Sequence, residues 1–178
     1  MLFLLKFTPM KLYQLKSIQK LPISTEEAWN FLSDPKNLKV ITPDYMGFEI
    51  LSGADRPMFP GQVIQYIVTP VAGIKTKWVT EITHVKENEY FVDEQRFGPY
   101  ALWHHKHFIK PIKGGVEMED VIDYKLPFGI LGRIAHPILV KKKLQEIFDY
   151  RRNKLIEIYG EYDENKPSEA RLNKDILN

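Results

Sequence analysis

Apolar and polar residues alternate with a period of two through most of the chain, which is typical of strands that are buried on one face. Such a pattern predicts a first strand at residues 11–21. Six more runs follow, each bounded by Gly, Pro, Asn or Asp, at residues 48–51, 63–69, 74–84, 90–96, 102–110 and 116–126. Most connections between them are of hairpin length, so we expect an antiparallel meander and not parallel βαβ units.

Two short helices are predicted between the first and second strands. Ser24 and Glu27 have the spacing of a capping box, in which each satisfies a free backbone amide of the other. An apolar stripe at helical spacing follows. The pair Asp34-Pro35 then offers a new N-cap with proline at the first helical position, so a second short helix should run to about residue 41.

A long C-terminal helix is predicted from residue 137 to about residue 159, with an apolar stripe of Val140, Leu144, Ile147, Phe148, Leu155 and Ile158. Basic residues at 141–143 and 151–152 are interpreted as a solvated face, because Glu146 and Asp149 lie at helical spacing from the lysines. One helix must cover the whole sheet. We therefore predict an α+β fold whose seven-stranded antiparallel sheet wraps around this helix and leaves space for a ligand.

Bulk composition limits the classes of function. The chain has 178 residues, 44% of them hydrophobic and 27% charged, which suits one globular domain at residues 11–160. It has no cysteine and a net charge of +2, so we predict no disulfides, no nucleic-acid partner and a cytoplasmic location. Residues 1–10 are an expected extension that ends at a possible second start, Met10. Residues 161–178 are an expected disordered tail.

Four short motifs and the final helix carry a resemblance to a known superfamily. The motifs are FVDEQ at 91–95, GPY at 98–100, WHHKH at 103–107 and DYKLPFG at 123–129. In order and spacing they resemble the SRPBCC ligand-binding superfamily, which includes START lipid-transfer domains, birch-pollen-type allergens and polyketide cyclases. The branch most similar is that of cell-division-inhibitor-like or polyketide cyclase/dehydrase-like proteins.

The resemblance covers roughly residues 11–160 and implies a helix-grip fold with an internal hydrophobic cavity. It implies no particular chemistry, because most members bind or carry a ligand and a minority are enzymes. It also transfers no catalytic residue. The positions that match the pattern of the branch are Asp93, Gln95, Trp103, His105, His107, Asp120 and Tyr124.

One predicted strand holds three of the five histidines within four positions, and strand alternation puts His105 and His107 on one face. The turn at 113–115 allows two registers, which place Asp120 opposite either His107 or Ile109. Both registers put Asp120 on the histidine face, so a polar cluster is predicted there.

Four interpretations of this cluster are open. It is a buried polar network without chemistry, or a set of groups that orient a ligand in an apolar cavity. Alternatively, His107 and Asp120 form an acid–base pair for cyclisation, dehydration or hydrolysis. The last option is a metal site. Residues 110–113 lack the acidic ligand that a cupin pattern places after the second histidine, so we predict no metal and no other cofactor.

The favoured function is the binding or carrying of a lipid-, quinone- or polyketide-like molecule. The alternatives are an enzyme that uses His107 and Asp120, and a regulatory protein that acts through a partner. The predicted cavity residues are Trp78, Asp93, Gln95, Tyr100, Trp103, His105, His107, Asp120 and Tyr124.

Loops at 70–73, 97–101 and 126–132 should share one rim, because alternate loops of a meander fall at the same end. Their apolar residues either close the core or form a portal with transient membrane contact. No stable membrane insertion is predicted.

Overall fold

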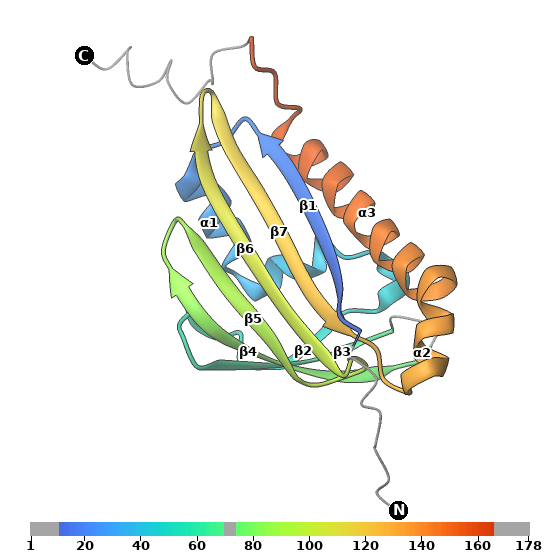
Figure 1. The fold of residues 1–178 in the computed structure, drawn as a ribbon. Helices are drawn as coiled ribbons and strands as arrows, with labels where there is room; N and C mark the ends of the chain where they lie inside the picture. The colour runs from blue at the N-terminus through green and yellow to red at the C-terminus, as the bar shows by residue number, and fades with distance from the viewer. Residues whose placement is uncertain (1–10, 70–73, 166–178) are drawn as a thin grey trace, which may run out of the picture.

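The computed structural model describes residues 11–69 and 74–165, and these form a curved sheet with helices packed on it (Figure 1). The sheet has seven antiparallel strands in the order β1-β7-β6-β5-β4-β3-β2. The strands are β1 (Tyr13–Leu21), β2 (Glu49–Ser52), β3 (Gln62–Val68), β4 (Thr76–Lys86), β5 (Tyr90–Phe97), β6 (Leu102–Ile112) and β7 (Gly115–Lys125). The predicted meander is confirmed, and the pairing of β1 with β7 adds the first strand to its end.

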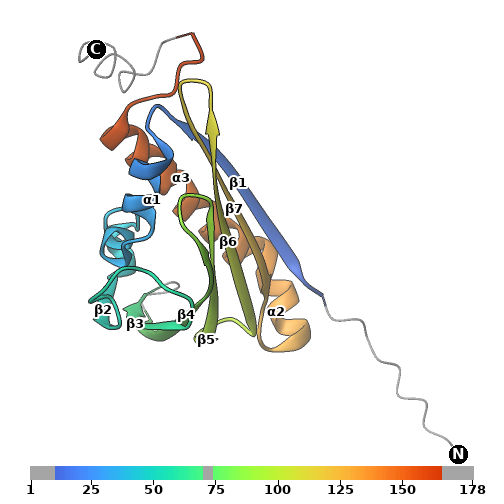
Figure 2. The same ribbon diagram turned by 90° about the vertical axis from the view of Figure 1, so that its left-hand side faces the viewer.

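The helices described are α1 (Thr25–Leu32), η1 (Pro35–Lys39), η2 (Asp44–Met46), α2 (Gly129–Ala135), η3 (His136–Val140) and α3 (Lys141–Tyr159). Figure 2 shows α1 and α3 on the same side of the sheet. The predicted α+β architecture, with short helices after the first strand and a long one at the end, is confirmed. The additional turn η2 was not predicted.

Local sequence explains where the first two helices begin. Ser24 accepts a hydrogen bond from the amide of Glu27, whose carboxylate accepts one from the amide of Ser24, so the capping box is present. Asp34 caps η1 through the amide of Lys36, with Pro35 at the first position. Here η1 is a 3-10 helix that ends at Lys39, two residues earlier than predicted.

The C-terminal helix differs from its prediction in where it begins. The α-helical part starts at Lys141, and the preceding segment His136–Val140 is π-helical and follows directly on α2. Proline at 137 has no N–H for an i→i−4 hydrogen bond and its ring crowds the preceding turn, which accounts for the altered ladder.

Two predictions for the faces of α3 were wrong. Ile158 is 41% exposed, because at the last turn Tyr159 instead packs edge-on against Phe31 of α1. Arg151, which was assigned to a solvated face, is only 9% exposed. It lies on the buried stripe between Phe148 and Leu155. The basic run at 141–143 behaves as predicted at Lys143, which pairs with Glu146 at 2.7 Å.

The β6–β7 hairpin fixes the register of the polar cluster. His107 pairs with Asp120, and Trp103 pairs with Tyr124, which confirms the register with Lys113-Gly114 as the turn. Inward and outward residues alternate along β7 as predicted. Its buried side chains are those of Val116, Met118, Asp120, Ile122 and Tyr124.

The predicted domain boundaries are not tested, because residues 1–10 and 166–178 lie outside the described residues. Of the predicted tail, the part up to residue 165 is described. In it the Tyr162 hydroxyl donates a hydrogen bond to the carbonyl oxygen of Lys113 at 2.7 Å.

We expect Gly115→Ala to destabilise the protein by about 1–3 kcal/mol, since a methyl group there would collide with the carbonyl oxygen of Leu21 at the end of β1. Lys113→Ala, in the same turn but exposed, is the control and should change stability by less than about 0.5 kcal/mol. Urea denaturation of both variants makes the measurement. Equal stability of the two would contradict the close backbone approach.

Candidate ligand-binding cavity

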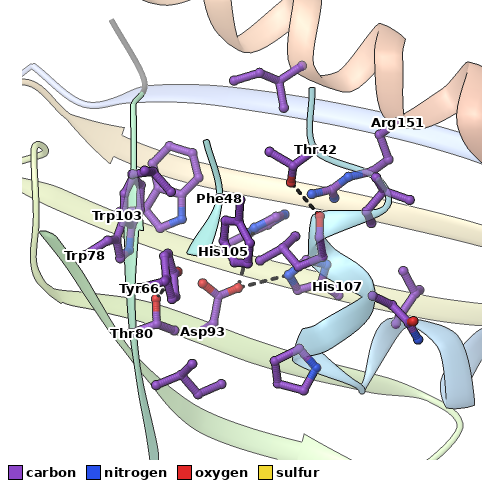
Figure 3. A pocket seen from close by; sticks show the side chains of 18 of the residues that line it. Thr42, Phe48, Tyr66, Trp78, Thr80, Asp93, Trp103, His105, His107 and Arg151 are labelled. Atoms are coloured by element: carbon purple, nitrogen blue, oxygen red, sulfur yellow. Dashed lines mark hydrogen bonds and ion pairs between the residues drawn. The ribbon is translucent and has the colours of Figure 1, made fainter. Parts of the chain in front are cut away.

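A cavity of about 190 Å³ lies between the concave face of the sheet and the helices α1, η1 and α3. Its wall is largely apolar, because the inward positions of β3 and β4 and the inner faces of the helices are aliphatic or aromatic. The apolar lining includes Phe31, Leu38, Ile41, Met46, Phe48, Met58, Ile64, Val68, Ile82, Phe91, Ile122, Leu144, Ile147 and Phe148. Figure 3 shows part of this lining together with the polar groups that reach into it.

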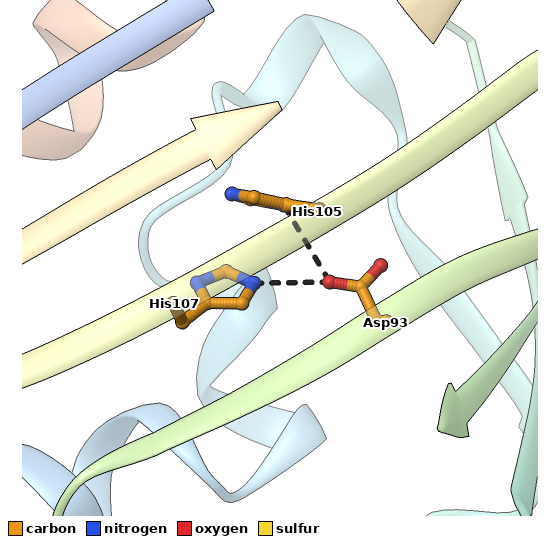
Figure 4. Close-up of side chains that lie close together, drawn as sticks. All are labelled: Asp93, His105 and His107. Atoms are coloured by element: carbon orange, nitrogen blue, oxygen red, sulfur yellow. Dashed lines mark hydrogen bonds and ion pairs between the residues drawn. The ribbon is translucent and has the colours of Figure 1, made fainter. Parts of the chain in front are cut away.

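Two carboxylates and two imidazoles make a closed ring of contacts beside the cavity. Asp93 Oδ2 lies 3.0 Å from His107 Nε2 and 3.5 Å from His105 Nδ1 (Figure 4). Asp120 Oδ1 lies 2.7 Å from His107 Nδ1 and 3.0 Å from His105 Nε2. Each carboxylate therefore contacts both imidazoles, and Arg151 Nη1 adds a fifth group 3.5 Å from Asp120 Oδ1.

Four elements supply this ring. Asp93 comes from β5, both histidines from β6, Asp120 from β7 and Arg151 from α3. The pairing of Asp93 with His105 and of Asp120 with His107 across neighbouring strands brings the side chains to one face.

The two carboxylates are ionised. Burial alone would raise the pKa of Asp120, but hydrogen bonds from His105 and His107, with the charges of His107 and Arg151, hold that pKa well below its ordinary value. Burial also opposes ionisation of Asp93, and the hydrogen bond from His107 and the neighbouring positive charges lower its pKa.

The two imidazoles differ in protonation. Burial disfavours the charged form of His107, but its hydrogen bonds to Asp120 and Asp93 together outweigh burial and raise its pKa. For His105, burial and the charge of His107 lower the pKa, in spite of the hydrogen bond to Asp120. With His107 charged and His105 neutral, Asp93, Asp120, Arg151 and His107 sum to zero charge.

This arrangement is poorly suited to acid–base catalysis. Both ring nitrogens of His107 are engaged by carboxylates, so neither is free to take a proton from a molecule in the cavity. The predicted contact between His107 and Asp120 is confirmed. The additional partner Asp93 turns that pair into a symmetric ion-paired bridge.

A metal is a second chemical possibility, since ligand atoms of Asp93, His105 and His107 all lie within 4.8 Å of one another. The third ligand would be Asp93 of β5, and not a residue that follows the second histidine in the sequence. The fit is poor. A divalent ion requires a deprotonated imidazole, whereas the carboxylates favour the protonated form of His107 and Arg151 already neutralises Asp120.

The structure places the predicted cavity residues in two groups. Those that line the cavity are Trp78, Asp93, Tyr100, Trp103, His105 and His107. Asp120 lies behind the imidazoles and outside the lining.

The other two predicted residues hold neighbouring segments. Gln95 hydrogen-bonds the backbone of Tyr100 at both N (3.2 Å) and O (2.7 Å), and so positions a loop. The Tyr124 hydroxyl lies 2.7 Å from Nε2 of His136, whose ring stacks on Tyr13. Neither Gln95 nor Tyr124 is part of the lining.

Sequence reasoning missed the role of Arg151 and most of the lining from helices. One signal was available for Arg151. It lies three residues after Phe148 and four before Leu155, which is the spacing of a buried helical face.

The predicted rim is described only in part, because residues 70–73 lie outside the described residues. Phe128, Ile130 and Leu131 are 82%, 72% and 73% exposed, and Tyr100 lines the cavity. A portal at this end stays a prediction. Among the described residues, no helix combines the length and the apolar character needed to cross a membrane.

No protein-family model and no curated protein matches the sequence. Solved structures do match over nearly the whole fold. A protein of Chromobacterium violaceum is 13% identical with a TM-score of 0.63, over 84% of this chain and 98% of that one. The allergen Ara h 8.0201 is 15% identical with a TM-score of 0.56, over 83% and 99%.

A Thalictrum flavum norcoclaurine synthase point mutant, solved with a transition-state analogue, is 13% identical with a TM-score of 0.58, over 85% of this chain and 98% of that one. The chain shares the helix-grip fold with these proteins. At these identities the likeness establishes the fold and leaves function to the site itself.

The buried ring predicts that Asp120→Asn is strongly destabilising, by about 3–5 kcal/mol, since Asp93 alone cannot compensate the charges of both His107 and Arg151. Asp123→Asn on the outer face of the same strand removes contacts to Lys106 and Gln14 that are partly solvated, and should cost less than about 1 kcal/mol. Chemical denaturation at pH 7 compares them. Similar losses in the two variants would show that the ring carries no special energy.

The raised pKa of His107 also predicts a pH dependence. Folded His107 holds its proton above the unfolded pKa of about 6.5, so stability should fall as pH rises from there through the folded pKa. His105 contributes in the opposite direction near pH 6.5, because its folded pKa is lowered and its unfolded form loses a proton there. The comparison with a variant that lacks only His107 removes this contribution.

Denaturant midpoints between pH 6.5 and 9 should therefore decline in the native protein and stay flatter in His107→Gln. If both proteins gave parallel curves, the imidazolium assignment would be wrong.

Proposed function

We propose that this protein binds and carries a hydrophobic small molecule in its internal cavity. The observation that supports this is the apolar lining of a void that the imidazoles of His105 and His107 also face. A packed interior would have favoured the regulatory alternative. The occupied nitrogens of His107 favour carriage over catalysis.

The volume of the cavity limits the size of the ligand. An apolar cavity of about 150 Å³ accommodates benzene, so about 190 Å³ suits a single substituted ring. A lipid with long chains would need the helices to move apart. We therefore narrow the earlier range of lipid-, quinone- or polyketide-like compounds to ring-sized ones.

The apolar wall alone supports only weak binding. An aromatic ring system buries roughly 150–250 Å², which at about 25 cal/mol per Å² contributes about 4–6 kcal/mol. That corresponds to dissociation constants of about 1 mM to about 0.05 mM. Tighter binding requires polar contacts between the ligand and the wall.

The first test is native mass spectrometry of freshly purified protein, followed by solvent extraction of whatever co-purifies. We expect a ring-sized apolar compound at up to one copy per chain.

The second test uses variants with the single-ring compound acetophenone as a probe, and its binding is followed by the quenching of tryptophan fluorescence, since Trp78 and Trp103 lie in the wall. Val68→Phe fills the cavity from β3 and should weaken binding at least about tenfold. Val63→Phe on the same strand is the control, because Val63 is 45% exposed on the outer face. Undiminished binding to Val68→Phe, or an equal loss in both variants, would exclude the cavity as the binding site.

A further inference from the structure

Two N–H groups of the cavity wall have no hydrogen-bond partner among the described residues. They are Trp78 Nε1 and Arg151 Nε, both buried. Buried donors in folded proteins are almost always paired, so each of these atoms calls for an explanation. Both belong to residues that are only 9% exposed, and both are donors that cannot act as acceptors.

The neighbours of Trp78 cannot satisfy its indole. Its ring stacks on Tyr66 at 6.1 Å and meets Trp103 edge-on at 5.4 Å. The Tyr66 hydroxyl bonds the Thr80 hydroxyl at 2.6 Å and makes no hydrogen bond to the indole. Because the part of the chain that the structure describes offers this indole no acceptor, a ligand in the cavity is the candidate to supply one.

Arg151 uses one side of its guanidinium in the ring of charges and leaves the other free. Nη1 faces Asp120, and the guanidinium carbon lies 4.9 Å from the centre of the Phe148 ring. Figure 3 shows the side chain reaching from α3 into the pocket. Nε, which is unpaired, is one edge of a group built for planar oxygen acceptors.

The two donors occupy separate parts of the wall. In Figure 3 Trp78 and Arg151 lie at opposite sides of the labelled residues, with Phe48 and His105 between them. One acceptor atom cannot serve both. A ligand that satisfies both needs two oxygens with an apolar body between them.

Charge decides between a neutral and an anionic ligand. The charged groups that face the cavity or the ring are Asp93, Asp120, Arg151 and the two imidazoles, and they balance with one imidazole protonated. A carboxylate would add a negative charge that no described group in the wall offsets. A carbonyl or ether oxygen accepts a hydrogen bond without that cost.

We propose that the cavity binds a neutral ring compound with two acceptor oxygens, a carbonyl bonded to Arg151 Nε and a second oxygen bonded to Trp78 Nε1. This inference rests on the proposed function, since it names the class of ligand for the same cavity. The two hydrogen bonds would supply the polar contacts that binding tighter than apolar burial alone requires.

The test compares three probes of similar size by titration calorimetry with the full chain. They are 4-methoxyacetophenone with two oxygens, acetophenone with one, and cumene with none. Trp78→Phe keeps a benzene ring in the wall and removes the N–H donor together with the five-membered ring of the indole. This substitution should lower the affinity for 4-methoxyacetophenone about tenfold, which corresponds to one neutral hydrogen bond. The affinity for cumene should change less than twofold.

Arg151→Lys keeps the positive charge beside Asp120 and removes Nε. It should weaken both ketones by about tenfold and leave cumene unchanged. The matched controls are Trp29→Phe, which is buried outside the cavity, and Arg152→Lys, whose guanidinium bonds the carbonyl oxygen of Ile18. Neither control should alter the affinity for any probe.

A spectroscopic readout tests the indole contact directly. In a ¹H–¹⁵N spectrum the Trp78 indole signal is identified by its loss in Trp78→Phe. We expect 4-methoxyacetophenone to move this signal downfield and cumene to leave the proton near its free position.

The outcomes separate this inference from the proposed function. If all three probes bind and neither variant discriminates among them, the cavity binds ligands but the acceptor pattern is wrong. Tighter binding of 4-methoxybenzoate than of the ketone would overturn the neutral class. If no probe binds at millimolar concentration, both proposals fail.

Discussion

The fold depends on a buried ring of ionisable groups that come from several elements and compensate one another. Asp93, His105, His107 and Asp120 are compensated only while β5, β6 and β7 stand in their present register. A shift of one residue would turn each of these groups to the opposite face and bury others in their place. Arg151 extends the same constraint to α3. The ring therefore fixes both the strand register and the position of the helix over the sheet.

This fixed position also explains why a void persists beneath the helix. A cavity costs dispersion energy, and a helix free to move would settle onto the sheet and close it. Here the contact between Arg151 and Asp120 fixes the distance between one part of α3 and the sheet. Trp78, Tyr100 and Trp103 form a mutually packed aromatic wall that resists collapse from the side.

Alternation and turn chemistry were sufficient to predict the seven strands, the shared face of His105, His107 and Asp120, and the long final helix. They could not identify Asp93 as a partner of the histidines. That contact depends on the register between β5 and β6, which the loop at 98–101 does not specify. Gln95 shares the predicted face of Asp93, but a register shift at Val79/Thr80 lies beside it, and bulges re-aim side chains.

The helical half of the cavity was harder to predict for a related reason. An apolar stripe on a helix predicts which residues are buried. It does not predict whether they pack against the sheet or line a cavity. Phe148 and Arg151 lie on one stripe, yet the first is an apolar wall and the second supplies a charge and an unpaired donor. Because the ring neutralises that charge internally, the site is polar but has no net charge that a ligand must compensate. Selection among ligands then depends on where a ligand carries its acceptor oxygens relative to the donors in the wall. The positions of these donors in space cannot be read from the periodicity of the sequence.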